Sequence, residues 1–414
     1  MPCWAPGCLA WPGFAATGPD ALRVLFCADA AYAEPGNGAA RSMATLMEWL
    51  AAAGHSCHAV TTGRFELPNQ SIRAQHDQFG AIRIPGPRAT ARYRRAGVDV
   101  VAVETLHPNA ATPDPAGGAP FRAALAQAVA ACPDLVLAYG GDPLVHAALG
   151  QARRQGARTV FTLHAWGYED RRWFTHADRV LAASPFLARA YRARIGLQAD
   201  GIPPLLDWSV TEAPAEARGF VTFVNPSLHK GAALFARLAD MLGRRRPDIP
   251  MLIVQSGQDA SALAAIPGLD LARYPQILVS PCLPQPRDVF ALARILLVPS
   301  LFEEPFGRIA AEAMIAGVPP LVSDRGALPG TVGDGGIVLP VPAWMDAGTR
   351  RIPDEAELEH WFDAVVALWD DQAHYAAAAG RARAAASRLY AEADLHARYL
   401  DAFTGPCPPL FPGR

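Results

Sequence analysis

Short apolar runs alternate with helical patterns along most of this chain, and this rhythm limits its fold more than any other feature. Residues 39–53 show a helical period whose apolar face consists of Met43, Leu46, Met47 and Leu50. Runs rich in valine and leucine are typical of strands that are buried on both faces of a parallel sheet. The first half contains six such runs: ALRVLFCAD, HAVTT, VDVVAVET, PDLVLAYG, ARTVFTLH and DRVLAAS. We therefore predict an α/β fold with a doubly wound parallel sheet.

The rhythm stops near the middle of the chain and then starts again. Pro203–Pro204 and the segment Thr211–Gly219 break the pattern, and we interpret them as a linker. After it, the strands GFVTFV, PMLIVQS, ILLVPS and PPLVS alternate with helical patterns at 232–246, 287–293 and 308–316. A chain of 414 residues is also too long for one ordinary core. The sequence thus predicts two Rossmann-like domains facing across a cleft, with ligand at the carboxyl ends of the strands.

Four segments follow from this pattern. Residues 1–20 are expected to be a disordered or frayed extension, because their start, MPCWAPGCLAWPGFAA, has helix-breaking prolines and lacks the basic region of a signal peptide. Residues 21–208 are expected to form the N-terminal domain and residues 209–388 the C-terminal domain. Residues 389–414 are expected to form a C-terminal helix and tail that packs back toward the N-terminal domain.

The composition excludes several classes of protein. Hydrophobic residues make up 51% of the chain and the net charge is −2, which indicates a soluble globular protein and neither a disordered nor a nucleic-acid-coating one. The seven cysteines include no CxxC pair, which argues against a disulfide framework or a zinc site and favours a reducing cytoplasm. No uncharged apolar run is long enough to span a membrane.

A single lysine stands out among the basic side chains. Of the 37 lysines and arginines, only Lys230 is a lysine, and it lies in the strand–loop–helix segment FVTFVNPSLHKGAALF. An ammonium is a compact point charge that arginine's planar fork cannot always replace against a phosphate oxygen. We therefore predict that Lys230 meets a diphosphate; one lysine left on the surface by chance is the alternative.

Two glutamates, Glu304 and Glu312, lie eight residues apart beyond the strand ILLVPS. Pro305 disfavours the helical conformation for Glu304, so the helix is expected to begin near Phe306–Gly307 and to contain Glu312. Carboxylates accept hydrogen bonds from the hydroxyls of a sugar or a ribose. The first N–H groups of the helix are free and form an anion site. Gly307 has no side chain, so a phosphate can approach these groups closely. The alternative is two solvated acids near a helix start.

The segment LVPSLFEEPFGRIAAEAMIAGVPPLVSDRGALPG closely resembles the donor-binding segment of glycosyltransferase family 4, the retaining enzymes with the GT-B fold. The resemblance is strong over residues 220–340 and diffuse in the N-terminal half. It implies that Glu304 binds hydroxyls of the transferred sugar and that Glu312 binds the nucleotide ribose. The backbone of Phe306 and Gly307 would contact the sugar and diphosphate, and Lys230 would neutralise the diphosphate.

The resemblance is incomplete at three places. Asn225 stands where the family usually has an arginine, so one positive charge is missing from the diphosphate site. Either another arginine compensates, with Arg308 the nearest candidate, or turnover is impaired. Gly330 stands where the family often has glutamate, and the segment Gly201–Asp207 replaces the family's Pro-Asn-Gly motif. We interpret these departures as specialisation.

The N-terminal half offers two weaker candidates. Gly36, Asn37 and Gly38 follow the first strand, where the family has a glycine-rich loop on the acceptor side. An ordinary strand-to-helix turn is the alternative. His164 ends the strand ARTVFTLH, and in the resembled family a histidine at this strand end lies near the sugar and the reaction centre. The alternative is a structural histidine.

A cluster of arginines lies between two expected strands of the N-terminal half: Arg83, Arg88, Arg92, Arg94 and Arg95. Some relatives use such a cluster to contact anionic membranes or lipid-linked acceptors, which would place the protein at the inner face of the membrane. A solvated face of long side chains is the alternative. Tyr93 is the only aromatic residue within the cluster, so nucleic acid is not expected as a partner.

The resemblance implies a cytoplasmic, metal-independent retaining glycosyltransferase with Lys230, Glu304 and His164 as candidate catalytic residues. Its donor would be a nucleotide-diphosphate sugar, and its acceptor a saccharide, a lipid-linked saccharide or a small molecule. The product would be a polysaccharide, a glycolipid or a related glycoconjugate. Two alternatives stay open: a nucleotide-sugar epimerase or hydrolase on the same fold, and a non-catalytic sugar-nucleotide-binding homologue.

Overall fold

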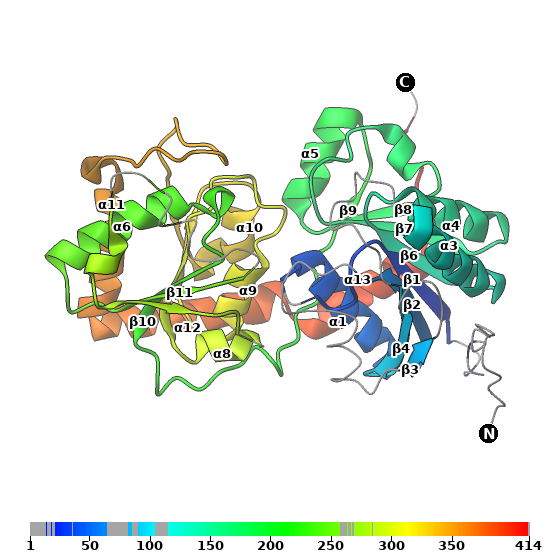
Figure 1. Ribbon diagram of the computed structural model, residues 1–414, viewed down its shortest axis with the longest axis horizontal. Helices are drawn as coiled ribbons and strands as arrows, with labels where there is room; N and C mark the ends of the chain where they lie inside the picture. Colours follow the sequence, from blue (N-terminus) through cyan, green and yellow to red (C-terminus); the bar gives the residue numbers. More distant parts are fainter. Residues whose placement is uncertain are drawn as a thin grey trace. The chain divides into compact units, whose positions relative to one another are not determined.

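The computed structural model divides into two compact units, Met1–Leu205 with Leu395–Arg414 (unit 1) and Leu206–Asp394 (unit 2) (Figure 1). It describes Phe14, Gly18 and residues 21–34, 36–63, 82–84, 90–103, 115–256, 263, 266, 269–283 and 285–412. Most of the predicted N-terminal extension therefore lies outside the described residues. Each unit contains a largely parallel sheet covered by helices, which confirms the predicted class of two parallel-sheet α/β domains.

Among the described residues of unit 1, nine strands form one sheet in the order β3-β4-β5-β2-β1-β6-β7-β8-β9. All neighbours are parallel except β3–β4 and β4–β5, which are antiparallel. The strands are β1 (Arg23–Ala28), β2 (Ser56–Thr62), β3 (Ile82–Ile84), β4 (Thr90–Arg95), β5 (Val98–Val103), β6 (Leu135–Tyr139), β7 (Arg158–Leu163), β8 (Arg179–Ala182) and β9 (Asp200–Gly201). The six predicted apolar runs coincide with β1, β2 and β5–β8. The hairpin β3–β4 was not predicted, because its arginine-rich sequence has no continuous apolar run.

Helices cover this sheet: α1 (Gly38–Ala52), α3 (Pro115–Ala130), α4 (Pro143–Arg154), η1 (Arg171–Phe174), α5 (Pro185–Ile195) and α13 (Glu392–Thr404). The predicted apolar face of α1 is confirmed, since Met43, Leu46, Met47 and Leu50 are all buried. The helix begins at Gly38 because the side chain of Asn37 caps it, accepting a hydrogen bond from the amide of Ala40 at 2.9 Å.

The C-terminal segment is part of unit 1, although it follows unit 2 in the sequence. The guanidinium of Arg158 on β7 donates to the carbonyl oxygens of Phe403 at 2.6 Å and Gly405 at 2.5 Å. Arg179 on β8 likewise donates to the carbonyl of Ala402 at 2.8 Å, and the amide of Gln198 donates to Leu410 at 2.8 Å. The C-terminal segment is thus tied to β7 and β8 of unit 1 through the side chains of Arg158 and Arg179.

Replacing Arg158 with alanine should lower the free energy of unfolding by about 2 kcal/mol, because two hydrogen bonds from a charged group are lost. Urea unfolding followed by tryptophan fluorescence measures the change. Arg154→Ala is the matched control: Arg154 is exposed at the end of α4, and its loss should change stability by less than about 0.5 kcal/mol. Equal effects of the two substitutions would contradict this role of the C-terminal segment.

Unit 2 has a six-stranded, entirely parallel sheet in the order β12-β11-β10-β13-β14-β15. Its strands are β10 (Phe220–Val224), β11 (Met251–Val254), β12 (Ile277–Ser280), β13 (Ala293–Val298), β14 (Pro320–Ser323) and β15 (Ile337–Leu339). Its helices are η2 (Leu228–Lys230), α6 (Ala232–Arg245), η3 (Leu271–Arg273), α8 (Pro286–Phe290), α9 (Arg308–Ile315), α10 (Leu328–Val332), η4 (Gly333–Gly335), α11 (Glu355–Asp370) and α12 (Gln372–Leu389).

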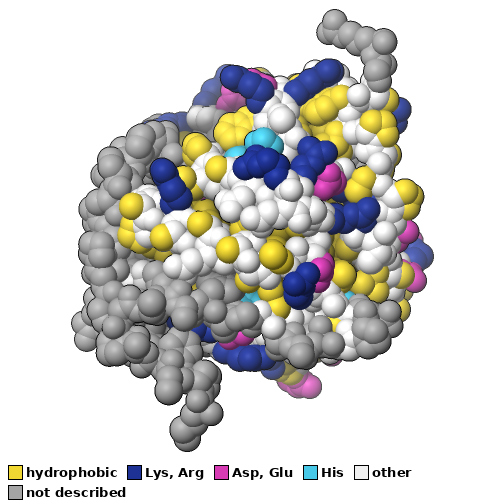
Figure 2. All heavy atoms as spheres, turned by 90° about the vertical axis from the view of Figure 1, so that its right-hand side faces the viewer, with side chains coloured by type: hydrophobic (Ala, Val, Ile, Leu, Met, Phe, Trp, Pro, Cys, Tyr) yellow, Lys and Arg dark blue, Asp and Glu magenta, His cyan; other side chains and the backbone are white. Residues whose placement is uncertain are grey.

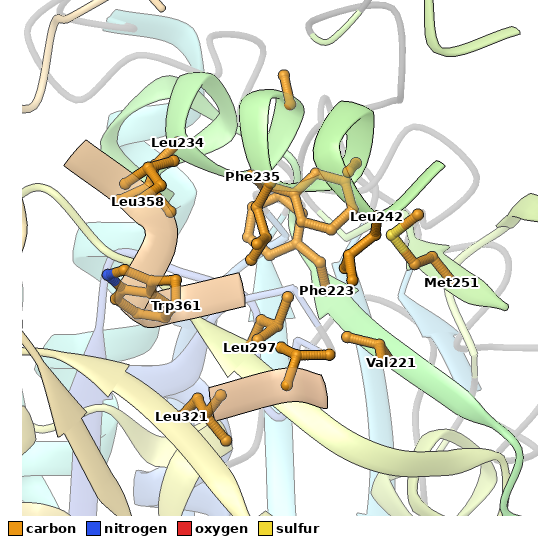
Figure 3. Close-up of a cluster of buried hydrophobic side chains, with 14 of the residues drawn as sticks. Val221, Phe223, Leu234, Phe235, Leu242, Met251, Leu297, Leu321, Leu358 and Trp361 are labelled. Carbon is orange, nitrogen blue, oxygen red and sulfur yellow. The ribbon is translucent and has the colours of Figure 1, made fainter. Parts of the chain in front are cut away.

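The core of unit 2 lies between this sheet and the pair α6 and α11 (Figure 3). Phe223 of β10 stacks on Phe235 of α6, with ring centroids 4.5 Å apart. Trp361 of α11 is fully buried, and its indole N–H donates to the carbonyl of Pro340 at 2.9 Å. A second pair, α9 and α12, packs together elsewhere on the unit (Figure 1). These contacts hold β10 and β13 side by side.

The strand order of unit 2 reverses at β10, which lies between β11 and β13. The chain therefore leaves β10 and β13 in opposite directions, and ligands of such sheets bind beyond the carboxyl ends of the strands at this point. The turn that holds Lys230 follows β10, and the loop that holds Glu304 follows β13. The topology alone thus brings the two segments together.

Candidate functional site

The turn after β10 is shaped by two residues with left-handed backbone conformations. Asn225 has φ 61°, which asparagine tolerates better than most residues. Its backbone N–H donates to the carbonyl of Val254 at 2.9 Å. Gly231 has φ 91°, and a β-carbon there would lie 2.0 Å from the carbonyl oxygen of Pro299. Only glycine allows this approach. It brings Lys230 against the segment that follows β13.

The loop that holds Glu304 is fixed on two sides. On one side, the amide of Leu301 donates to the carbonyl of His229 at 2.9 Å. On the other, the amide of Ala327 donates to the carbonyl of Glu304 at 2.8 Å, and Gly326 packs directly on the Glu304 backbone. The Glu304 side chain is buried as a result, with a residue exposure of 5%.

Lys230 and Glu304, which the sequence analysis assigned to the same donor, form an ion pair. Lys230 Nζ lies 2.6 Å from Glu304 Oε1, and the Ser300 hydroxyl donates to the same oxygen at 2.6 Å. The ammonium also lies 4.9 Å from the centre of the Phe302 ring, a cation–π contact. The lysine side chain is 26% exposed, so it reaches the surface of unit 2.

Glu312 lies on α9, the helix that follows the loop of Glu304, and is fully buried. Its Oε1 accepts a hydrogen bond from Arg308 Nε at 2.8 Å, one turn earlier on the same helix. Arg308 was the candidate to replace the charge missing at Asn225, and its guanidinium is instead engaged by Glu312. The structure thus brings Arg308 and Glu312 together as an ion pair on one face of α9.

The start of α9 has the conformation expected of an anion site. Gly307 caps the helix with φ 87°, and a β-carbon there would lie 2.5 Å from Leu328. Phe306 is buried with its ring edge-on to Tyr390 at 5.8 Å, and its carbonyl accepts the Thr331 hydroxyl. The backbone at the helix start is therefore held rigidly while its first N–H groups stay outside the helical hydrogen-bond pattern.

Asn225 Oδ1 is buried and accepts no hydrogen bond from the part of the chain that the structure describes. An amide can hydrogen-bond to a ligand but supplies no net charge. Burial and the neighbouring Lys230 lower the pKa of His229, while Glu304 opposes that shift. The imidazole therefore adds less positive charge near neutral pH than an exposed histidine would.

The candidates in unit 1 lie apart in sequence but near strand ends. Gly36–Gly38 is the loop before α1, where Asn37 acts as the helix cap. His164 is half-buried just beyond β7, with its ring edge-on to Tyr139 at 5.9 Å. It lines a small cavity whose other walls come from α1, β7, β8 and α13: Ser42, Met43, Leu46, Thr162, Leu181, Ala182, Ala183, Ile202 and Tyr399.

The arginine cluster is only partly described: Arg88 lies outside the described residues, as does the side chain of Arg83. Arg95 pairs with Glu48 at 3.0 Å and Arg94 with Asp99 at 3.7 Å. Burial lowers the pKa of Arg92. The face in Figure 2 likewise shows basic side chains scattered singly, several of them beside acidic ones. In the described part of the chain, no helix is both long and apolar enough to cross a bilayer.

Sequence reasoning missed Ser300 and Phe302, which contact Glu304 and Lys230. The signal for Ser300 was available, since a polar residue directly after a buried strand is a candidate for a site at the sheet edge. Phe302 carried no such signal, because an aromatic residue in an apolar segment usually belongs to the core.

Two family models match the chain. Residues 36–204 match Glycosyltransferase Family 4, and residues 219–371 match Glycosyl transferases group 1. No curated protein matches it.

Solved structures with a similar fold include the sucrose-phosphate synthase of Thermosynechococcus elongatus, with a TM-score of 0.63 and 18% identity over 92% of this chain and 98% of that one. HepE of Anabaena in complex with UDP and glucose has a TM-score of 0.64 and 16% identity over 93% and 100%. The catalytic domain of Starch Synthase IV from Arabidopsis thaliana, bound to ADP and acarbose, has a TM-score of 0.67 and 14% identity over 93% and 99%. At these identities the likeness concerns the fold.

Proposed function

Since the chain belongs to glycosyltransferase family 4 and is a GT-B glycosyltransferase, we propose that it transfers a sugar from a nucleotide-diphosphate donor to an acceptor hydroxyl with retention at the anomeric carbon. The observation that carries the proposal is the Lys230–Glu304 pair at 2.6 Å, beyond the carboxyl ends of β10 and β13. One cation for a diphosphate and one carboxylate for a sugar hydroxyl then lie side by side.

Lys230 serves the leaving group. When the anomeric C–O bond breaks, negative charge grows on the diphosphate, and a fixed ammonium stabilises it most in the transition state. One N–H of Lys230 is used by Glu304, which leaves the others for phosphate oxygens. The N–H groups at the start of α9, beside Gly307, add a positive dipole. The acceptor oxygen bonds to the anomeric carbon on the face that the diphosphate leaves, and the acceptor proton passes to the diphosphate.

Other residues bind the rest of the donor. Glu312 accepts hydrogen bonds from the ribose, and the Arg308 guanidinium, which donates to its buried carboxylate at 2.8 Å, holds that carboxylate in place. Asn225 contributes a neutral hydrogen bond to the diphosphate, where the family's arginine would contribute a charge. His164 contacts the sugar or the acceptor from unit 1. In this proposal Lys230 and the α9 start carry the charge stabilisation, so that no metal is required.

The acceptor is a saccharide, a lipid-linked saccharide or a small molecule, and the reaction takes place in the cytoplasm. HepE and Starch Synthase IV, whose structures hold UDP with glucose and ADP with acarbose, suggest the donors to try first. The ion pairs of Arg94 and Arg95 reduce the free positive charge of the arginine cluster. Contact with anionic lipid therefore depends on the remaining arginines of that cluster.

A donor screen followed by product analysis tests the function. A bound donor raises the melting temperature, since it stabilises the folded state by RT ln(1 + [L]/Kd). We expect one family among UDP-, GDP- and ADP-sugars to do so, and the same donor to be consumed only when an acceptor is present. Proton NMR of the product should show the anomeric configuration of the donor.

Each other outcome has a definite meaning. Donor consumption without an acceptor would identify a hydrolase or an epimerase. Donor binding without turnover across the acceptor panel would identify a non-catalytic binder, and an inverted product would refute retention.

A further inference from the structure

The Glu304 carboxylate uses only one of its two oxygens within the protein. Lys230 Nζ and the Ser300 hydroxyl both meet Oε1 at 2.6 Å. Within the residues that the structure describes, no group donates a hydrogen bond to Oε2. A carboxylate oxygen has two lone-pair directions, and both on Oε1 are taken. The side chain is therefore oriented, with Oε2 as the oxygen left for a ligand.

Ser300 is itself held in place by the sheet. It is fully buried directly after β13, and its carbonyl accepts the hydroxyl of Ser323, the last residue of β14, at 2.7 Å. Ser323 is fully buried as well. Because β13 and β14 are paired neighbours, this bond fixes the backbone from which the Ser300 hydroxyl reaches Glu304. The hydroxyl must be the donor, since an ionised carboxylate only accepts.

The ammonium on the other side of Oε1 is also restrained. Lys230 Nζ lies over the face of Phe302, and the edge of His229 meets that ring at 5.3 Å with an interplanar angle of 82°. The amides of Leu301 and Phe302 both donate to the carbonyl of His229. Lysine, carboxylate and serine thus form one rigid row across the ends of β10 and β13.

Without the Ser300 hydroxyl, an ammonium and a carboxylate have a simpler arrangement. A lysine gains most from a carboxylate by contacting both oxygens, and among the described residues Ser300 is the other side chain that hydrogen-bonds to this carboxylate, at Oε1. A free carboxylate would rotate until Oε2 also faced the ammonium. The ligand would then lose its acceptor, although the charge of the site would be unchanged.

We propose that Ser300 is a positioning residue that turns Glu304 Oε2 toward the transferred sugar and thereby makes the enzyme select donors with a free hydroxyl at that place. This inference rests on the proposed function. It defines a substrate class: a sugar whose hydroxyl at the contacted carbon is absent or acylated cannot donate to Oε2 and is refused. Discrimination of this kind is strong because a buried acceptor is left unpaired.

The test compares Ser300→Ala with Thr211→Val, a control that removes a similarly buried hydroxyl of unit 2, one that donates to the backbone carbonyl of Asp207 instead of to Glu304. Calorimetry measures Kd for UDP, GDP and ADP and for UDP-glucose, GDP-mannose and ADP-glucose. For the nucleotide that binds, Ser300→Ala should raise the Kd of the sugar conjugate about tenfold or more, because one hydrogen bond to a charged group is lost. The nucleotide diphosphate itself should change less than about twofold, since Glu304 contacts only the sugar.

A kinetic cycle provides the second readout. Ser300→Ala should lower kcat/KM for the complete donor but not for the monodeoxy donor that lacks the recognised hydroxyl. Ser300→Cys, similar in size with a weaker donor, should lie between serine and alanine. Equal weakening of the nucleotide and its sugar conjugate, or unchanged hydroxyl discrimination in Ser300→Ala, would overturn the inference while leaving the glycosyltransferase intact. Failure of the unsubstituted protein to bind any of the six probes would instead overturn the proposed function, and this inference with it.

Discussion

Lys230→Ala is expected to lower kcat/KM for the donor by at least about 10²–10³, the usual loss when one fixed electrostatic contact to a developing anion is removed. The effect has two sources. The substitution removes the ammonium nearest to the proposed diphosphate site, and it leaves the buried Glu304 carboxylate without the counter-charge that lies 2.6 Å away. An unpaired carboxylate repels a leaving diphosphate. Initial-rate assays with the donor found by the screen measure the loss.

Two controls separate chemistry from folding. Lys230→Arg keeps the charge but replaces a point donor with a planar fork, so its activity should fall between that of alanine and lysine. Arg350→Ala removes one positive charge from an exposed position of unit 2 and should change kcat/KM by less than about twofold. The melting temperature of Lys230→Ala should stay within a few degrees of the parent. Turnover near that of the parent would discard Lys230 as a site residue.

Glu304→Gln is the second substitution with a large expected effect, a loss of at least about 100-fold in kcat/KM. Glutamine keeps the size of the side chain but loses the charge that attracts Lys230, and its amide group donates where the carboxylate accepts from Ser300 or from the sugar. Steady-state kinetics should show the loss mainly in the steps that involve the sugar. Binding of the nucleotide diphosphate alone should be nearly unchanged.

The neighbouring residue supplies the control for this substitution. Glu303 is exposed, whereas Glu304 is buried, with a residue exposure of 5%. Glu303→Gln makes the same chemical change one position away and should alter kcat/KM by less than about twofold. If the two substitutions cost the same activity, the assignment of Glu304 to the sugar is wrong.

The α/β class and the two-part organisation were predictable because hydrophobic periodicity is a local property of the sequence. Runs such as LVLAY on β6 and ILLV on β13 are apolar throughout, which happens when both faces of a strand are covered. The hairpin β3–β4 was not predictable in this way. Arg92, Arg94 and Arg95 interrupt β4, which lies next to the edge strand β3 and is fully buried at only three of its six positions.

The charged residues of the candidate site could be singled out from the sequence, but the uncharged residues that contact them could not. A lone lysine and two spaced acids have distinctive chemistry, so Lys230, Glu304 and Glu312 could be singled out from the sequence. The pairing of Arg308 with Glu312 could be expected from the sequence, because residues four apart on a helix lie on the same face. Ser300 meets Glu304 within the loop after β13, and Lys230 reaches the same carboxylate because β13 lies beside β10, an adjacency that is a property of the sheet and not of the local sequence.

The path of the chain through unit 1 has a consequence for biosynthesis. Residues up to Leu205 leave the ribosome before unit 2, yet their compact unit also includes Leu395–Arg414, which follows unit 2 in the sequence. Arg158 and Arg179 therefore wait for their carbonyl partners while all of unit 2 is synthesised. Unit 2 is one uninterrupted stretch and has no such delay, so the nascent chain should complete the unit that holds Lys230 and Glu304 while the earlier unit is still unfinished.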